Sequence, residues 1–342
     1  MIQKTLPRPI QQDEAQVIFV LSGIPGIFVL SGIPGTHRGR ERGFGIPDNT
    51  NSILLAAISP RLRLQSLRHA SSFAMAVSSF RHAPSFAMAV SSLRHPSSFT
   101  MVKAVHSGAT TPKDATSEAI WDWVTNVEST YYILGSVAGP RPYPMMVREF
   151  HAVIDKETRK QALEKLGGKP NILFACVGGA SNAIGLFHEF VDDEDVRLIG
   201  VEATGFGLDS DKHTATLTKG EVGVLHGAMN YLLQDEDGQI VEPHSIIWTT
   251  LDLDHLGFGP EHSILKDIGH AEYYSITDKE ALEAFKRLSR LEDMIPALET
   301  FHALAYLEKL CPTLSNGTKV VLNCSGRGDK DVQTAIKYLQ VE

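Results

Sequence analysis

Cysteine is scarce in this chain of 342 residues, and long hydrophobic runs are absent. A membrane-spanning helix needs about 20 consecutive apolar residues, and no run approaches that length, so the sequence predicts no such helix. The three cysteines, Cys176, Cys311 and Cys324, lie far apart and lack the spacing of metal ligands. Isolated cysteines of this kind are typical of reduced thiols in the core of an intracellular protein.

Acidic residues are missing between Asp48 and Asp114, although the whole chain carries a formal net charge of −8. The overall negative charge disfavours non-specific binding to nucleic acid or to anionic membranes, so neither is expected as a partner. The acid-free stretch differs from the remainder, in which acidic and basic residues are mixed as on an ordinary globular surface. Two kinds of sequence are therefore joined in one chain.

Repeats occupy the first hundred residues. The segment IFVLSGIPG occurs at residues 18–26 and again at 27–35, and a 13-residue unit at 67–79 recurs at 80–92 and partly at 93–105. These periods match none of the common solenoid repeats, which favours a local duplication without a selected fold. A second interpretation is a plastid or mitochondrial transit-type segment over residues 49–104, because such peptides are rich in Ser and Arg and poor in acids.

Beyond residue 102 the pattern changes to alternating helices and short apolar strands. An apolar run at residues 172–176 is typical of a buried parallel strand, and Thr277 and Glu280 have the spacing of a capping box before a helix that ends at 291. This order predicts an α/β fold with a doubly wound parallel sheet. The other predicted helices cover residues 113–127, 147–166 and 181–190, and the other predicted strands cover 196–201 and 320–323.

Two glycine turns follow predicted strands, where ligands bind in sheets of this kind. The first reads Val-Gly-Gly-Ala-Ser-Asn-Ala at 177–183, and its N–H groups can converge with a helix dipole on a phosphate. It has neither the lysine nor the spacing of a Walker loop, so an ordinary tight turn is the alternative. The second reads Ser-Gly-Arg-Gly-Asp-Lys at 325–330 and offers the Ser325 hydroxyl to a heteroaromatic nitrogen.

A third motif reads Ile-Pro-Ala-Leu-Glu-Thr-Phe-His at 295–302 and places Glu299 near a helix start, where a solvated first-turn acid is the alternative. Together and in this order, the three motifs resemble those of the β chain of tryptophan synthase, a fold-type II pyridoxal-phosphate (PLP) enzyme. That family's motifs read GGGSNA, IPALE-x-x-HA and SGRGDKD. The resemblance runs from about residue 102 to 339 and is closest to the plant branch, which indicates a plastid location.

The resemblance implies a fold-type II doubly wound sheet and three regions. Residues 1–101 are a repeat-containing, acid-poor segment that we expect to be disordered and unrelated to the family. Residues 102–146 are a remnant of the mobile amino-terminal domain that responds to the α subunit, and residues 147–342 are the PLP-binding domain. The family condenses L-serine with indole to give L-tryptophan, and its β chains form homodimers that bind the α subunit.

The resemblance also implies roles for single residues. Ser325 would meet the pyridine nitrogen of PLP, Glu299 would lie beside the ring, and Asp254 would help to close the site over substrate. Lys113 would lie in the region that responds to the α subunit. The residues that would hold the phosphate are Gly178, Gly179, Ala180, Ser181 and Asn182, with Ser136 close by. The carbonyls that would bind a monovalent cation, K⁺ or Na⁺, are those of Gly178, His255 and Gly257.

Several family features are missing from this sequence. The Schiff-base lysine of the family belongs to a His-Lys-Ile/Leu-Asn motif, and no such motif occurs here. The glutamate that acts on indole and the glycine-rich loop that holds the substrate carboxylate are also lacking, so the amino-terminal domain is expected to be incomplete. Ala180 replaces the third glycine of the phosphate loop, and its methyl group would crowd the phosphate if the position requires a positive φ.

Loss of a catalytic group such as this lysine typically costs several orders of magnitude in rate. We therefore expect a truncated tryptophan synthase β-like protein without activity of its own. One alternative is a non-catalytic partner of an intact β chain or of the α subunit. The other is a different fold-type II enzyme, such as a serine or threonine dehydratase.

Overall fold

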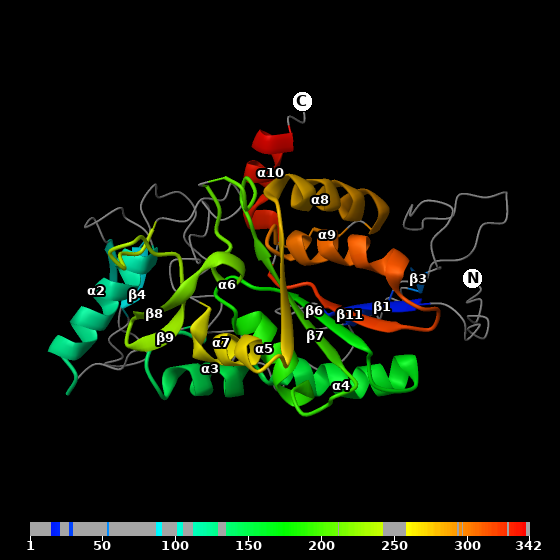
Figure 1. Ribbon diagram of the computed structural model, residues 1–342, viewed down its shortest axis with the longest axis horizontal. Coiled ribbons are helices and arrows are strands. Elements are labelled where there is room, and N and C mark those ends of the chain that lie inside the picture. Colours follow the sequence, from blue (N-terminus) through cyan, green and yellow to red (C-terminus); the bar gives the residue numbers. More distant parts are fainter. Residues whose placement is uncertain are drawn as a thin grey trace.

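A parallel sheet covered by helices on both faces forms the centre of the molecule in the computed structural model (Figure 1). None of the helices that the structure describes is long and apolar enough to cross a membrane. The structure describes residues 15–20, 27–29, 53–54, 87–90, 101–104, 112–128, 135–210, 212–241, 258–292, 294–295, 297–326 and 328–339.

The sheet has seven strands in the order β10-β7-β6-β11-β1-β2, with β3 paired to β1 off this path. All neighbours from β10 to β1 are parallel, and only β2 is antiparallel to its neighbour. The prediction of a doubly wound parallel α/β sheet is confirmed. The strands are β1 (Ala15–Val20), β2 (Ile27–Val29), β3 (Ile53–Leu54), β6 (Ile172–Cys176), β7 (Arg197–Ala203), β10 (Ala271–Ile276) and β11 (Lys319–Asn323).

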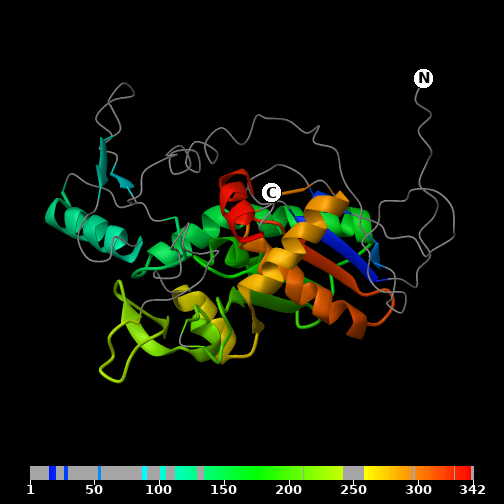
Figure 2. The ribbon, with the colours of Figure 1, turned by 90° about the horizontal axis from the view of Figure 1, so that it is seen from above.

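The central strands are apolar on both faces, as strands covered by helices on both sides must be. Every residue of β6 is buried, and so is every residue of β11 except Lys319. On one face, side chains such as Phe174 and Leu322 pack in a cluster with α8 (Asp278–Glu292) and α9 (Thr300–Leu310). Figure 2 shows these two helices lying over the sheet. The capping box predicted at Thr277 is confirmed, because its backbone N–H donates to Glu280 Oε2 at 3.0 Å and its hydroxyl oxygen accepts from the Glu280 N–H at 3.4 Å.

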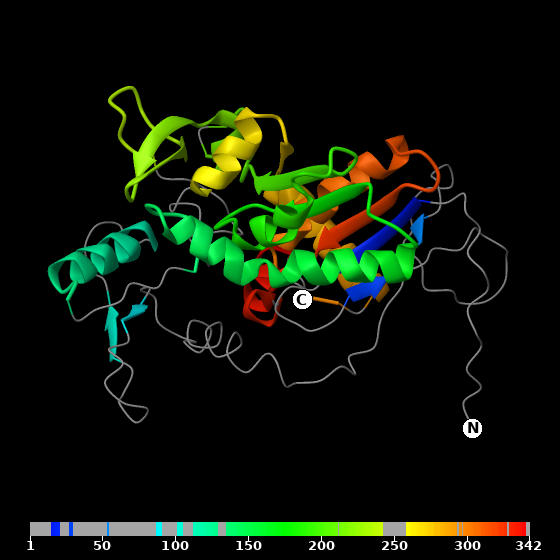
Figure 3. The same ribbon diagram turned by 90° about the horizontal axis from the view of Figure 1, so that it is seen from below.

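The opposite face carries α4 (Val153–Leu166), α5 (Ser181–Phe187) and α7 (Gly259–Asp267). The prediction of one helix over residues 147–166 is wrong. The helix is interrupted at Ala152, which separates α3 (Tyr143–His151) from α4, and the two run end to end in Figure 3. The break comes one residue after His151, which α5 approaches closely at Gly185. Helical periodicity within one segment gives no signal of such a contact.

The amino-terminal region contributes strands that the sequence interpretation did not include. Within residues 1–101, which we expected to be disordered, β1 pairs in parallel with β11 from Gln16 opposite Lys319 to Val20 opposite Asn323. The Ile-Phe-Val triplets of the two 9-residue repeats lie in β1 and β2 and pair with each other. Branched and aromatic residues favour strands, so these short triplets are compatible with the edge of the sheet.

Two antiparallel hairpins lie outside the main sheet, and neither was predicted. One joins β4 (Ala87–Val90) to β5 (Met101–Ala104), and the other joins β8 (Glu221–Leu225) to β9 (Ala228–Leu232). The tight turn of the second hairpin uses two residues with positive φ, His226 at 50° and Gly227 at 76°. Helix α2 (Pro112–Thr125) starts one residue before the helix predicted over residues 113–127 and ends two residues before its predicted end.

Candidate functional site

The chain reverses its direction across the sheet between β6 and β11. From β6 it proceeds to β7 and then to β10 on one side, and the later strand β11 pairs with β6 on its other side. In parallel sheets, the crevice beyond the carboxyl ends of the strands at such a switch point is the usual ligand site. The loops that follow β6 and β11 are the two glycine turns singled out in the sequence.

The loop after β6 is held in a special backbone conformation at Ala180. This residue has φ 62° and ψ −3°, in the left-handed region that favours glycine. The Ser181 N–H donates to Gly179 O at 2.9 Å, and the Ile184 N–H donates to Ala180 O at 3.0 Å. The position therefore does have a positive φ, but the Ala180 side chain is buried and belongs to the apolar cluster beneath the loop.

Side-chain amides join this loop to the end of β11. Asn182 Nδ2 donates to Cys176 O at 3.0 Å, which closes the loop onto the last residue of β6. Asn323, the last residue of β11, donates through Nδ2 to Asn182 O and Oδ1 at 3.2 and 3.1 Å. The two glycine turns are thus held side by side at the switch point.

The Ser325 hydroxyl is buried and contacts two neutral polar side chains. Its Oγ is 3.2 Å from Cys176 Sγ and 3.3 Å from Thr300 Oγ1, and the Thr300 hydroxyl also donates to Ser325 O at 2.9 Å. Gly326 follows with φ 72°, and a Cβ atom there would lie 2.7 Å from Ala297 Cβ. Glycine is therefore required immediately after Ser325.

Glu299 stands at the amino-terminal cap of α9 and is only 8% exposed, so the alternative of a solvated first-turn acid is wrong. Its segment is tied to the loop after β11 by two hydrogen bonds. The Leu298 N–H donates to Asp331 Oδ2 at 2.9 Å, and the Gly328 N–H donates to Ile295 O at 2.8 Å. The three sequence motifs therefore meet at one place.

Cys176 interacts with both Ser325 and Glu299. Burial raises the pKa of its thiol to about 11, the hydrogen bond with Ser325 lowers that pKa, and the negative charge of Glu299 raises it. The Glu299 carboxylate thus acts on the same thiol that contacts Ser325. All three cysteines are free and buried, as the sequence predicted.

The predicted site residues separate into two groups. The structure brings together Gly178, Gly179, Ala180, Ser181, Asn182, Ser325 and Glu299. Ser136 is buried, and its neighbour Val137 packs in the same apolar cluster as Ala180. Asp254, His255 and Gly257 lie outside the described residues, as does the side chain of Lys113 on α2. The described residues contain no group of three or more side chains that could hold a metal ion.

Sequence reasoning missed four residues that hold the site together: Cys176, Thr300, Asn323 and Asp331. Thr300 lies inside a recognised motif, and the other three stand within one or two residues of one. Their polar groups are buried beside apolar strands, and a buried polar group requires a hydrogen-bond partner. That requirement was the available signal.

A family model described as "Pyridoxal-phosphate dependent enzyme" matches residues 142–326, which is more than half of the chain. The chain belongs to this family. Similar solved structures include an O-ureido-L-serine synthase, with 12% identity and a TM-score of 0.41 over 64% of this chain and 57% of that chain. A cysteine synthase from Entamoeba histolytica has 13% identity and a TM-score of 0.42 over 66% of this chain and 59% of that chain. The chain spans less than two thirds of the length of either protein.

The residues at the switch point fit the cofactor of this family. The loop from Gly178 to Asn182 has the small residues and the tight backbone that suit a phosphate group. Ser325 offers a buried, neutral hydroxyl that suits an uncharged pyridine nitrogen.

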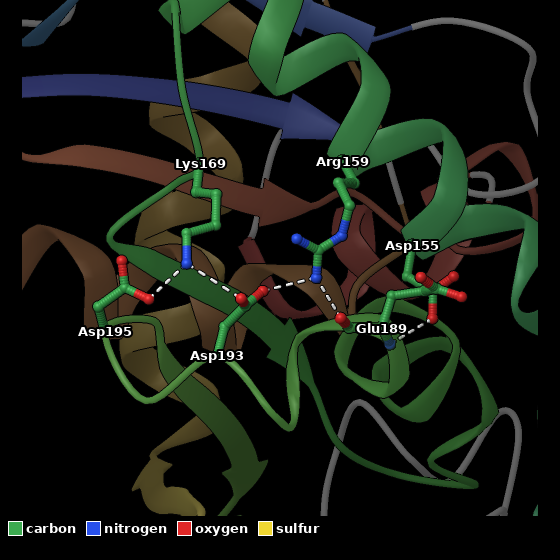
Figure 4. Close-up of polar contacts among 6 residues, drawn as sticks. All are labelled: Asp155, Arg159, Lys169, Glu189, Asp193 and Asp195. Carbon is green, nitrogen blue, oxygen red and sulfur yellow. Dashed lines mark hydrogen bonds and ion pairs between the residues drawn. The ribbon is translucent and has the colours of Figure 1, made fainter.

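Two lysines that the structure describes have partners of their own. Lys169 precedes β6, at the end of the strand opposite to the glycine turn, and pairs with Asp193 and Asp195 (Figure 4). Lys266 donates to Leu217 O.

Proposed function

We propose that this chain is a tryptophan synthase β-like protein that binds PLP between β6 and β11 without a covalent link. The supporting observation is the junction of three motifs at the switch point, where Asn323 bonds to Asn182 and Ser325 contacts both Cys176 and Thr300. The loop from Gly178 to Asn182 would hold the phosphate, and the Ser325 hydroxyl would donate a hydrogen bond to the pyridine nitrogen.

The neutral side chains that contact Ser325, Cys176 and Thr300, favour one kind of PLP chemistry over others. PLP, when bound, supplies an electron sink for a reacting amino acid, and a ring nitrogen that stays uncharged weakens that sink. A hydroxyl that is flanked by a thiol and a second hydroxyl does not keep the nitrogen protonated. This environment suits replacement at Cβ of L-serine, with indole as the second substrate, as in the tryptophan synthase family.

Turnover is not expected from these 342 residues alone. The sequence contains no His-Lys-Ile/Leu-Asn motif, so the group that normally carries the cofactor and moves the substrate proton is missing. The purified chain, given PLP, L-serine and indole, should form no more tryptophan than a control without protein. Tryptophan formed above that control would contradict this part of the proposal.

Binding of PLP provides a separate test. Ser325→Ala removes one hydrogen bond at the ring, worth about 1 kcal/mol, so the dissociation constant for PLP should rise about fivefold in equilibrium dialysis. Ser315→Ala, in the exposed turn before the opposite end of β11, is the matched control and should leave binding unchanged. Equal affinities of the wild type and Ser325→Ala would refute the assigned ring contact.

A second candidate function, a non-catalytic partner of an intact β chain or of an α subunit, is favoured by helix α2. Trp121, Val124 and Val127 in and just after this helix are 69%, 55% and 59% exposed. Exposed apolar side chains gathered in one segment are typical of interaction sites. Co-purification of the tagged chain with either subunit would support this function, and loss of the interaction in Trp121→Glu would assign it to α2.

A further inference from the structure

The carbonyl of Ala180 has a second donor that comes from a distant part of the chain. His262, on α7, is fully buried, and its Nε2 lies 3.1 Å from Ala180 O. Its other ring nitrogen, Nδ1, lies 2.8 Å from the hydroxyl of Tyr273 on β10. A continuous chain of hydrogen bonds therefore runs from β10 through α7 to the loop after β6.

The chemistry of these partners fixes where the protons are. A carbonyl oxygen can only accept, so Nε2 of His262 must carry the hydrogen. Nδ1 of the neutral ring is then an acceptor, and the Tyr273 hydroxyl donates to it. Burial lowers the pKa of His262 to about 4 and raises the pKa of Tyr273. Both groups therefore keep these roles around neutral pH.

The ring of His262 is placed by tight packing. Phe187 and Tyr273 meet it edge-on, with centroid distances of 6.2 and 5.9 Å. Tyr273 in turn lies opposite Gly200 of β7, and a Cβ atom on Gly200 would be 2.7 Å from the tyrosine ring. The absence of a side chain at Gly200 makes room for the Tyr273 ring. The packing of β7 against β10 therefore fixes the position of the Tyr273 hydroxyl that donates to His262.

Ala180 needs this support because alanine is unfavourable at positive φ. Its carbonyl oxygen accepts from both Ile184 N–H and His262 Nε2, which uses both lone pairs and fixes the plane of the peptide. Rotation of this peptide would break the hydrogen bond from the Ser181 N–H to Gly179 O and change the shape of the loop at the place where the phosphate would bind. A residue outside the loop thereby controls the shape of the loop.

We propose that His262 is a positioning residue that holds Ala180 in the left-handed conformation required for PLP binding. This inference rests on the proposed function, because it assigns the phosphate of PLP to the loop from Gly178 to Asn182. His262 does not touch the cofactor in this scheme. It acts through the Ala180 carbonyl, and Tyr273 acts through His262.

The experiment measures the dissociation constant for PLP, by equilibrium dialysis, and the melting temperature of each purified variant. His262→Leu removes the donor and should weaken PLP binding about tenfold, whereas His262→Gln keeps an N–H within reach of Ala180 O and should lose less than threefold. Tyr273→Phe should weaken binding about threefold. His270→Leu, an exposed histidine just beyond the end of α7, is the matched control and should bind as the wild type does.

A double-mutant cycle with Ala180→Gly separates positioning from general stability. Glycine adopts positive φ without strain, so the effect of His262→Leu on PLP binding should fall from about tenfold to about threefold in the Ala180→Gly background. An effect of the same size in both backgrounds would overturn the inference. Amide hydrogen exchange of the chain without PLP provides a second readout, and the Ser181 amide should exchange faster in His262→Leu.

The outcomes distinguish this inference from the proposed function. If the wild type fails to bind PLP, the proposed function fails and the inference fails with it. If the wild type binds PLP and folded His262→Leu binds equally well, only the inference is overturned. If His262→Leu does not fold, Tyr273→Phe decides, and wild-type affinity in that variant overturns the inference.

Discussion

Asp155 shows at the scale of one residue how burial changes the chemistry of a side chain. It lies on α4, is fully buried, and accepts a hydrogen bond from the Glu189 N–H at 2.9 Å through Oδ2 (Figure 4). Among the residues that the structure describes, its buried Oδ1 has no hydrogen-bond partner, and neither has the buried hydroxyl of Thr158 one turn further along the helix. Burial raises the pKa of Asp155 to about 7, although the hydrogen bond from the Glu189 N–H lowers it.

This raised pKa makes a prediction about stability. A carboxyl group whose pKa is higher in the folded than in the unfolded chain stabilises the fold at low pH, and this contribution is lost as the pH rises from about 4 to about 7. Asp155→Asn stays neutral, so at pH 8 it should be more stable than the wild type by about 2 kcal/mol, roughly half of the ideal linkage value. Urea unfolding at several pH values measures this difference.

Asp192→Asn is the control, because it removes an exposed charge from the turn that follows Glu189. It should leave the pH dependence of unfolding as it is in the wild type. If the free energy of unfolding depends on pH in the same way in Asp155→Asn and in the wild type, ionisation of Asp155 does not destabilise the folded protein, and the prediction is wrong. Glu202 has a pKa raised to about 7 by burial as well, so a residual slope of the same sign is expected in every variant.

The residues of the site were recognisable from sequence only where they belong to a motif. Ser325 and the loop from Gly178 to Asn182 follow apolar strands, and that placement alone predicts a ligand site in a doubly wound sheet. The partners Cys176 and Thr300 were not recognisable, because their contact with Ser325 depends on which strands are neighbours. The role of His262 depends on tertiary structure in the same way, since Ala180 is 82 positions away in the chain.

At the scale of helices and strands, close packing decides where elements begin and end. Helix α5 approaches α3 at Gly185, where a Cβ atom would lie 2.7 Å from His151 Cβ and 2.9 Å from His151 O. The helix prediction for residues 147–166 failed at this contact, since periodicity describes one helix and says nothing of a neighbour. Buried strands such as β6 were predicted with correct ends because an unbroken apolar run is a local signal.

Gly185→Ala tests this close approach. Alanine normally contributes about 1 kcal/mol to a helix relative to glycine, but here the added methyl group meets backbone atoms of α3 that cannot move freely. Overpacking of this kind costs about 1–3 kcal/mol, so we expect a net loss of about 1–2 kcal/mol in the free energy of unfolding, measured with urea. Gly135→Ala, which meets no atom within 4 Å, should change that free energy little. Unaltered stability of Gly185→Ala would show that α3 and α5 lie further apart.

The amino-terminal strands mark the limit of sequence reasoning at this scale. The Ile-Phe-Val triplets of the repeats have the composition of strands, but a strand of three to six residues has no partner that the sequence reveals. The place of β1 beside β11 follows from the edge that β11 offers, because an unpaired strand edge is a template for any compatible segment, and β2 pairs with β1 in turn. The register of β1 against β11 is a tertiary property.

For the whole molecule, the sheet order explains why motifs separated by more than a hundred residues form one site. The chain leaves β6 toward β7 and β10 and returns on the other side as β11, so the loops after β6 and β11 face each other. The segment that carries Glu299 joins them through Leu298 and Asp331. The family membership, the sheet order and these hydrogen bonds support the place proposed for the cofactor, and no His-Lys-Ile/Leu-Asn motif occurs in the sequence.

Native mass spectrometry of the chain saturated with PLP tests this account most directly, when it is combined with borohydride reduction and a denatured spectrum of the same sample. We predict one PLP per chain in the native spectrum and no added mass after reduction and denaturation, because the cofactor is held by hydrogen bonds alone. A stoichiometric adduct on a lysine in the denatured spectrum, or the absence of PLP from the native spectrum, would contradict the account.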